Sequence, residues 1–328
     1  MTELGSFRQL ERLSITSCAT PLQSVDFLLL LSQQLKQLSI CNVQIACPVS
    51  HLLSAIIALK RLTSLRFHHN GSLHVPAATG RRLFTSLPEL RQLSWEMITY
   101  KTLPHDFFSS AHLQDVLAGT LKLSALELLN YDAVVTQETL QSLSDLRSLS
   151  IIHLYSVPGP TCHLQTWLTA LPWLNSLSVH GGHPLGVYAN FLPESLHSLT
   201  LCVDMKPEDL ETVGQRTPHL QHLHLEPWTS ICGLLSLLPQ LFPQLRTLRI
   251  RHQHVSDSDF LSLQHLPHLR ILEVLDSYHR PDPADPSCVV YELSQRLLRL
   301  ISELQRLTNH RVCVTTARRR DPLTCQCF

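Results

Sequence analysis

The histidines and cysteines of this sequence are the side chains whose types fit metal binding. The chain has 20 histidines and 10 cysteines in 328 residues, and no Cys-x-x-Cys pair occurs. His222 and His224 lie on one face if their segment is a strand, and His252 and His254 follow one repeat later. The sequence places no carboxylate or cysteine to complete a tetrahedral site, so we expect a solvated histidine patch and no metal.

Motifs for enzymatic chemistry are absent from the sequence. It contains no GxxxxGK[ST] phosphate loop, GxSxG nucleophile turn, HExxH or GxGxxG. The chain has only 10 glycines, and this scarcity also disfavours phosphate-binding loops. We therefore expect a protein that is not an enzyme and that needs no cofactor.

The C-terminal residues fit a signal for lipid attachment. Residues 325–328 read CQCF, a Cys-a-a-X pattern in which Phe328 favours transfer of a geranylgeranyl group to Cys325. Three arginines at 318–320 offer the basic second signal that a single lipid chain needs for stable membrane binding. Cys325 is thus a lipidation candidate. The alternative is an unmodified, flexible basic tail.

One short string, Leu-x-x-Leu-x-aliphatic, recurs along the chain at intervals of about 26 residues. Its copies begin at Leu10, Leu35, Leu62, Leu90, Leu123, Leu146, Leu174, Leu196, Leu220, Leu245 and Leu269. The last two apolar positions are two residues apart, so both face inward from one short strand. Each copy therefore predicts one strand of a parallel sheet.

The residue between the two inward positions faces outward, and it is polar in every copy. These residues are Ser14, Ser39, Arg66, Ser94, Glu127, Ser150, Ser178, Thr200, His224, Arg249 and Glu273. Long charged side chains supply charge-assisted bonds and steering. We expect a partner to bind mainly at the last three repeats, and the candidate contacts are Arg66, Glu127, His222, His224, Glu226, Arg249, Arg251 and Glu273. The alternative is that they are only solvated strand faces.

Helical spacing of apolar residues separates the copies, as in Phe260, Leu263 and Leu266. A proline stands two or three residues before the first leucine of six copies, where it ends the helix and returns the chain to the sheet. These prolines are Pro88, Pro172, Pro193, Pro218, Pro243 and Pro267. Units of this size must stack to bury their apolar faces. The predicted fold is an α/β solenoid of about eleven β-α units with a parallel sheet on its concave side.

The C-terminal part of the sequence predicts a cap on the stack. Apolar residues from Val290 to Leu307 follow helical spacing, and residues 311–316 alternate like an edge strand that includes Cys313, expected to be buried. We therefore divide the chain into a solenoid at 1–278, a cap at 279–316 and a basic tail at 317–328. No cap precedes Leu10, which leads us to expect a shortened form or a domain upstream.

These patterns resemble the leucine-rich-repeat family, more particularly the cysteine-containing type found in F-box proteins. LERLSITSC ends in Cys18 at the strand-end cysteine position, and VSDSDFLSL and VTQETLQSL resemble the step and helix that follow. The resemblance implies a horseshoe that holds a protein substrate. F-box proteins of this family also dock on the Skp1–cullin ubiquitin ligase through an N-terminal F-box, and no such motif precedes Leu10.

The resemblance leads us to expect the substrate-recognition part of an F-box ubiquitin-ligase subunit, with Skp1 and cullin as partners if an F-box lies upstream. Two alternatives stay open: a cytosolic or membrane-tethered scaffold without a ligase role, and the repeats of a larger innate-immune receptor.

The charge and hydropathy of the chain limit its partners and its location. Lys and Arg number 26 and Asp and Glu number 26, so the chain lacks the basic field that nucleic-acid binding requires. No apolar stretch reaches the length of a spanning helix, and no signal peptide is present. We expect a cytoplasmic or nuclear protein with reduced cysteines, which meets a membrane only if Cys325 is prenylated.

Overall fold

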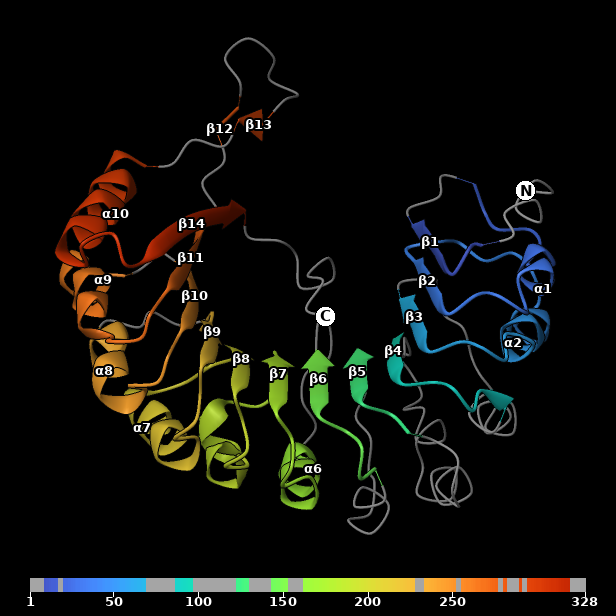
Figure 1. Cartoon of the computed structure of the whole chain (residues 1–328), viewed down its shortest axis with the longest axis horizontal. Helices are drawn as coiled ribbons and strands as arrows, with labels where there is room; N and C mark the ends of the chain where they lie inside the picture. Colours follow the sequence, from blue (N-terminus) through green and yellow to red (C-terminus); the bar gives the residue numbers. More distant parts are fainter. Residues whose placement is uncertain are drawn as a thin grey trace. The chain divides into compact units, whose positions relative to one another are not determined.

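The chain folds into repeated β-α units (Figure 1). The computed structural model describes residues 9–16, 20–68, 86–96, 122–129, 143–152, 162–227, 233–251, 255–276, 280–281, 289–290 and 294–318. The chain is divided into two compact units, a first unit of Met1–Leu174 and a second unit of Asn175–Phe328.

In its described residues the first unit contains six strands, and neighbours along the chain pair in parallel. They are β1 (Arg12–Thr16), β2 (Gln37–Cys41), β3 (Ser64–His68), β4 (Gln92–Glu96), β5 (Ala125–Leu129) and β6 (Ser148–Ile152). Its described helices are α1 (Phe27–Leu30), α2 (Val49–Ile57) and α6 (Leu164–Ala170).

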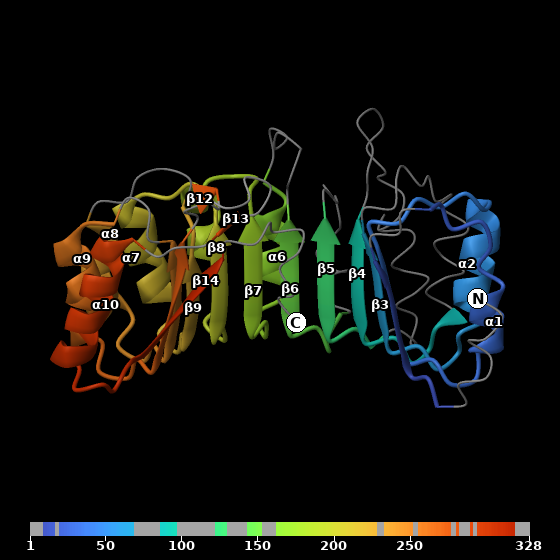
Figure 2. The ribbon, with the colours of Figure 1, turned by 90° about the horizontal axis from the view of Figure 1, so that it is seen from above.

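The second unit continues the pattern with six parallel strands. They are β7 (Ser176–His180), β8 (Ser198–Cys202), β9 (His222–Leu225), β10 (Thr247–Arg251), β11 (Ile271–Asp276) and β14 (Cys313–Arg318). Its helices are α7 (Pro207–Arg216), α8 (Leu234–Leu241), α9 (Asp257–Ser262) and α10 (Gln295–Leu307), with the short 3₁₀ turns η2 (Leu185–Val187), η3 (Ala189–Phe191) and η4 (Leu263–His265). Helices α7 to α10 cover one face of this unit's sheet (Figures 1 and 2). The opposite face is the concave face.

The repeat register predicted from the sequence is confirmed. In every copy the strand begins two residues after the first leucine, so Leu10 precedes Arg12 and Leu269 precedes Ile271. Both inward positions of the strands β7 to β11 are buried: Leu177, Leu199, Leu223, Leu248 and Leu272, then Val179, Leu201, Leu225, Ile250 and Val274. Each such side chain contributes about 1.5 to 3 kcal/mol by leaving water. The stack of leucines is therefore the main source of stability.

The prolines before the strands end the outer helices as expected. In the described part of the chain, Pro172, Pro218 and Pro243 each lie two residues after the last residue of α6, α7 and α8. A proline cannot donate a backbone hydrogen bond, and its ring disfavours the α conformation of its predecessor. The chain consequently leaves the helix and reaches the next inward leucine within a few residues.

The predicted C-terminal cap is present, but its helix is shorter than the apolar spacing indicates. Helix α10 begins at Gln295, because the Ser294 hydroxyl accepts a hydrogen bond from the Leu297 N–H at 3.1 Å and caps the first turn. Val290 belongs instead to β13 (Val289–Val290), which pairs antiparallel with β12 (Arg280–Pro281). Strand β14 pairs in parallel with β11 and ends the described sheet.

Candidate functional site

The outward positions predicted from the repeat form continuous rows along each sheet. In the first unit the strand pairing joins Ser14, Ser39, Arg66, Ser94, Glu127 and Ser150. In the second unit it joins Ser178, Thr200, His224, Arg249, Glu273 and Thr315. Neighbouring strands lie about 4.8 Å apart, so the side chains of one row touch one another. Several are buried by these contacts, and the alternative of a solvated face is wrong for Glu127 and His224.

The first unit holds a buried chain of polar groups centred on Ser94. The Ser94 hydroxyl donates to the Glu127 carboxylate and accepts from His68 Nε2. The same ring nitrogen of His68 lies 3.5 Å from Glu127 Oε1. Both His68 and Glu127 are at most 5 % exposed. His68 was not expected from the sequence, because it lies after the last aliphatic position of its repeat.

This arrangement is not that of a catalytic triad. In a triad the carboxylate orients the histidine through one ring nitrogen, and the other nitrogen faces the nucleophile. Here one nitrogen, Nε2 of His68, faces both Ser94 and Glu127. The histidine therefore does not link the carboxylate and the hydroxyl through separate ring nitrogens, and the geometry fits a structural network better than nucleophilic catalysis.

Burial is the main influence on the ionisation of Glu127. Removal from water raises the pKa of this carboxyl, and the smaller effects of the Ser94 hydrogen bond, the Arg66 charge and the Ser150 hydroxyl lower it. Folding therefore favours the protonated form of Glu127 more than the unfolded chain does. The stability that it contributes is complete below the carboxyl's unfolded pKa and is lost as the pH rises through the folded pKa.

Replacing Glu127 with glutamine is expected to make stability less dependent on pH. The variant keeps the size and one acceptor oxygen, and it has no charge to bury. The excess of its unfolding free energy over that of the wild type should therefore grow as the pH rises from the unfolded pKa of Glu127 through its folded pKa. Urea unfolding at several pH values measures the difference. Glu303→Gln is the control, because Arg306 lowers the pKa of Glu303 through a hydrogen bond and the sign is opposite. A Glu127→Gln difference that shrinks as pH rises would contradict the assignment.

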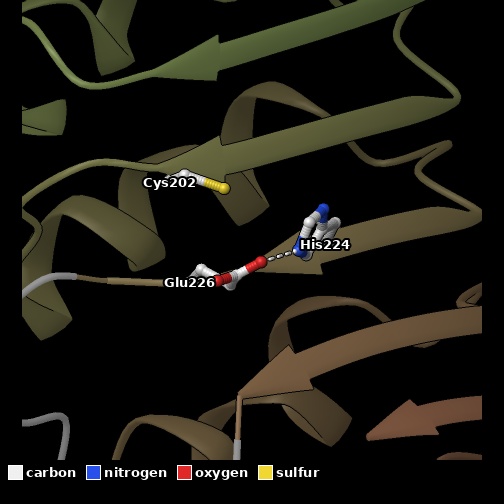
Figure 3. Close-up of side chains that lie close together, drawn as sticks. All are labelled: Cys202, His224 and Glu226. Atoms are coloured by element: carbon white, nitrogen blue, oxygen red, sulfur yellow. Dashed lines mark hydrogen bonds and ion pairs between the residues drawn. The ribbon is translucent and has the colours of Figure 1, made fainter. Parts of the chain in front are cut away.

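In the second unit, His224 joins Glu226 and Cys202 in a buried cluster (Figure 3). The His224 Nε2–H donates to Glu226 Oε1 at 2.8 Å. Cys202 ends β8 beside Glu226, since Leu201 pairs with Leu225 one residue earlier in each strand. The sequence suggested no carboxylate or cysteine that could complete a site at the histidines, but the structure places both Glu226 and Cys202 beside His224. The sequence did not reveal this neighbour, because Cys202 comes from the preceding repeat.

His180, at the end of β7, lies next to this cluster. Its ring is edge-on to that of His224, with centroids 6.5 Å apart, and its Nε2 is 2.9 Å from the Ser178 hydroxyl. Burial, followed by the neighbouring His224, lowers the pKa of His180 to about 4. His180 is therefore neutral near pH 7. This residue, too, was not expected from the sequence.

The accessible polar and charged side chains of the second unit's concave face come from β9, β10 and β11. Arg249 Nε lies 3.2 Å from Glu273 Oε2, and both side chains remain partly exposed. Arg251 is half-buried two residues further along β10, and His222 is exposed on β9. The candidate residues other than Arg66 and Glu127 thus gather on neighbouring strands of one unit.

Four predictions concern cysteines and histidines at other places. Cys18, His252, His254 and Cys325 lie outside the described residues. Cys313 is exposed, contrary to the expectation of a buried thiol. The reason is the strand alternation: Cys313 pairs with the exposed Ile271 and faces outward, while the neighbouring Val312 is buried. In the described part of the chain, no disulfide involves Cys41, Cys47, Cys162, Cys202 or Cys313.

Comparisons with known proteins identify the fold. Comparison with protein-family models and with curated protein sequences gave no match. Among solved structures, the leucine-rich repeat-containing protein LegL7 from Legionella pneumophila matches with a TM-score of 0.53 and 14 % identity, over 90 % of this chain and 98 % of that chain. The chain has the leucine-rich-repeat fold.

A second leucine-rich-repeat comparison agrees. A chain of the complex of Rad7 and Elc1 from yeast matches with a TM-score of 0.52 and 16 % identity, over 84 % of this chain and 78 % of that chain. Identities this low establish a likeness of fold and not of activity. In the part of the leucine-rich-repeat chain that the structure describes, no helix has both the length and the apolar character to cross a membrane.

Proposed function

We propose that this leucine-rich-repeat chain is a non-enzymatic module that binds a protein partner on its concave face. The observation that carries the proposal is the group of accessible polar and charged side chains on β9, β10 and β11: His222, Arg249, Arg251 and Glu273. Stacked repeats present such side chains on one extended surface. Partly exposed charges of both signs favour a partner with complementary charges and speed its association.

A photo-crosslinking amino acid in place of His222 tests this surface in cells. We expect a specific protein to be cross-linked from His222 on β9 and not from Arg299, which is exposed on α10 on the helical side. Mass spectrometry of the cross-linked products identifies the protein. Equal products from both positions, or none from His222, would overturn the proposal.

We also propose a finer role, the substrate-recognition part of an F-box ubiquitin-ligase subunit. The repeat sequence that ends in Cys18 supports it, as does the fold shared with a chain of the complex of Rad7 and Elc1. Co-purification of Skp1 and a cullin with the endogenous protein is the expected result. If neither is recovered while the His222 cross-link persists, the protein is a scaffold without a ligase role.

A further inference from the structure

Three potential metal ligands converge in the second unit. The sulfur of Cys202, a ring nitrogen of His224 and a carboxylate oxygen of Glu226 all lie within 4.8 Å of one another. Figure 3 shows the three side chains directed toward a common region from the ends of β8 and β9. Their residues are only 7 %, 8 % and 8 % exposed. The cluster is therefore sheltered from bulk water and positioned by paired strands.

The ligand types select a class of ion. Thiolate, imidazole and carboxylate together suit zinc and similar transition metals, whereas magnesium and calcium prefer oxygen ligands alone. Zinc bonds of about 2.0 to 2.3 Å in a tetrahedron place the ligand atoms about 3.3 to 3.7 Å apart. The hydrogen-bonded atoms of His224 and Glu226 are 2.8 Å apart, so binding needs them to separate by about half an ångström.

The surroundings of the cluster also fit a bound ion. His180 lies beside His224, is 4 % exposed, and its Nδ1 makes no hydrogen bond in the described structure. A buried polar atom without a partner has lost its hydrogen bonds to water. It recovers that free energy only by binding a ligand or by pairing with a hydrogen-bond donor or acceptor. The nearest cations, Arg249 and Arg251 on β10, oppose an added positive charge, and Glu273 offsets that of Arg249.

We propose that Cys202, His224 and Glu226 bind one divalent transition-metal ion of the zinc class, with a fourth position left for water. Binding removes the proton from the Cys202 thiol and releases it to solvent. The His224 Nε2 lone pair then faces the ion, and the ring proton moves to Nδ1 through solvent. Glu226 binds as the carboxylate, so one proton leaves for each ion bound and affinity rises with pH. The site goes beyond partner binding and does not require it.

Cobalt(II) titration of the reduced full chain, after dialysis against a chelator, tests the site directly. We expect one equivalent to bind and to give the thiolate-to-cobalt charge-transfer band and the intense ligand-field bands of a tetrahedral ion. Cys202→Ser should abolish the charge-transfer band, and Glu226→Gln should weaken binding by at least about tenfold. The matched controls Cys313→Ser and His222→Ala should leave both band and affinity unchanged, because both residues are exposed and lie outside the cluster.

A second measurement needs no variant and is independent of effects on folding. Zinc should protect Cys202 from alkylation by iodoacetamide, while Cys313 should react equally with and without zinc, as read by peptide mass spectrometry. The reaction is followed until Cys202 of the metal-free chain is alkylated, because this residue is only 7 % exposed. A charge-transfer band that survives in Cys202→Ser, or alkylation of Cys202 at the same rate with and without zinc, would overturn the proposal. The cluster would then be a hydrogen-bonded counter-charge for the arginines of β10.

Discussion

Replacing Leu304 with alanine is expected to lower the unfolding free energy by about 3 kcal/mol. Leu304 lies in the middle of α10 and is completely buried. The substitution removes the buried methyl groups of this side chain and leaves a cavity that the surrounding residues fill only partly. Because α10 closes the last repeat, the loss weakens the interface on which the neighbouring repeats depend.

Leu298→Ala in the same helix is the matched control. Leu298 is 40 % exposed, and the substitution deletes the same atoms at a position with the same helix propensity. We expect it to change the unfolding free energy by less than about 1 kcal/mol. Urea unfolding followed by circular dichroism measures both variants. Equal losses would show that α10 does not seal the end of the solenoid.

A charge exchange across β10 and β11 is expected to abolish partner binding while the fold is kept. In the double variant Arg249→Glu with Glu273→Arg, the ion pair and the net charge remain, but each charge stands where its opposite stood. A partner with complementary charges then meets like charges, which costs several kcal/mol. We expect the affinity for the protein cross-linked at His222 to fall by about 100-fold or more, as measured by isothermal titration calorimetry.

The same charge exchange on α10 tests whether the loss of binding is specific to the concave face or follows from any exchange of charges. Glu303 and Arg306 form an exposed ion pair of 2.6 Å on the helical side, and Glu303→Arg with Arg306→Glu repeats the chemistry there. This variant should bind the partner like the wild type. Equal loss of affinity in both double variants would place the partner elsewhere than the concave face.

The fold could be predicted because its determinants are local. The spacing of Leu10, Leu13 and Ile15 defines one strand and its inward face, and every later copy begins in the same register. Proline positions predicted the helix ends for the same reason, since their effect acts on the adjacent residue. The prediction of where α10 begins was less accurate, because the Ser294 cap determines the first residue of the helix and the apolar spacing does not.

The buried clusters could not be predicted, because they depend on which residues adjacent strands bring together. Cys202 and His224 are separated by a whole repeat in the sequence, and only the strand pairing places them side by side. The same holds for His68, Ser94 and Glu127 on three successive strands. Rows of outward residues were predicted correctly, but their burial was not, since it results from the size of the neighbours in each row.

The in-register pairing of the strands also fixes the distance between successive side chains of a row, and a ligand bound along the row has to match this distance. Successive side chains of a row are about 4.8 Å apart, whereas an α-helix advances about 5.4 Å per turn and an extended chain about 3.4 Å per residue. A helix laid along Thr200, His224, Arg249 and Glu273 drifts by only about 0.6 Å per strand, so it offers nearly one residue per turn to each position. In an extended segment, the rise of about 3.4 Å per residue already differs from the spacing of the row by about 1.4 Å after one residue. The spacing of the row thus matches a helical ligand more closely than a strand-like one.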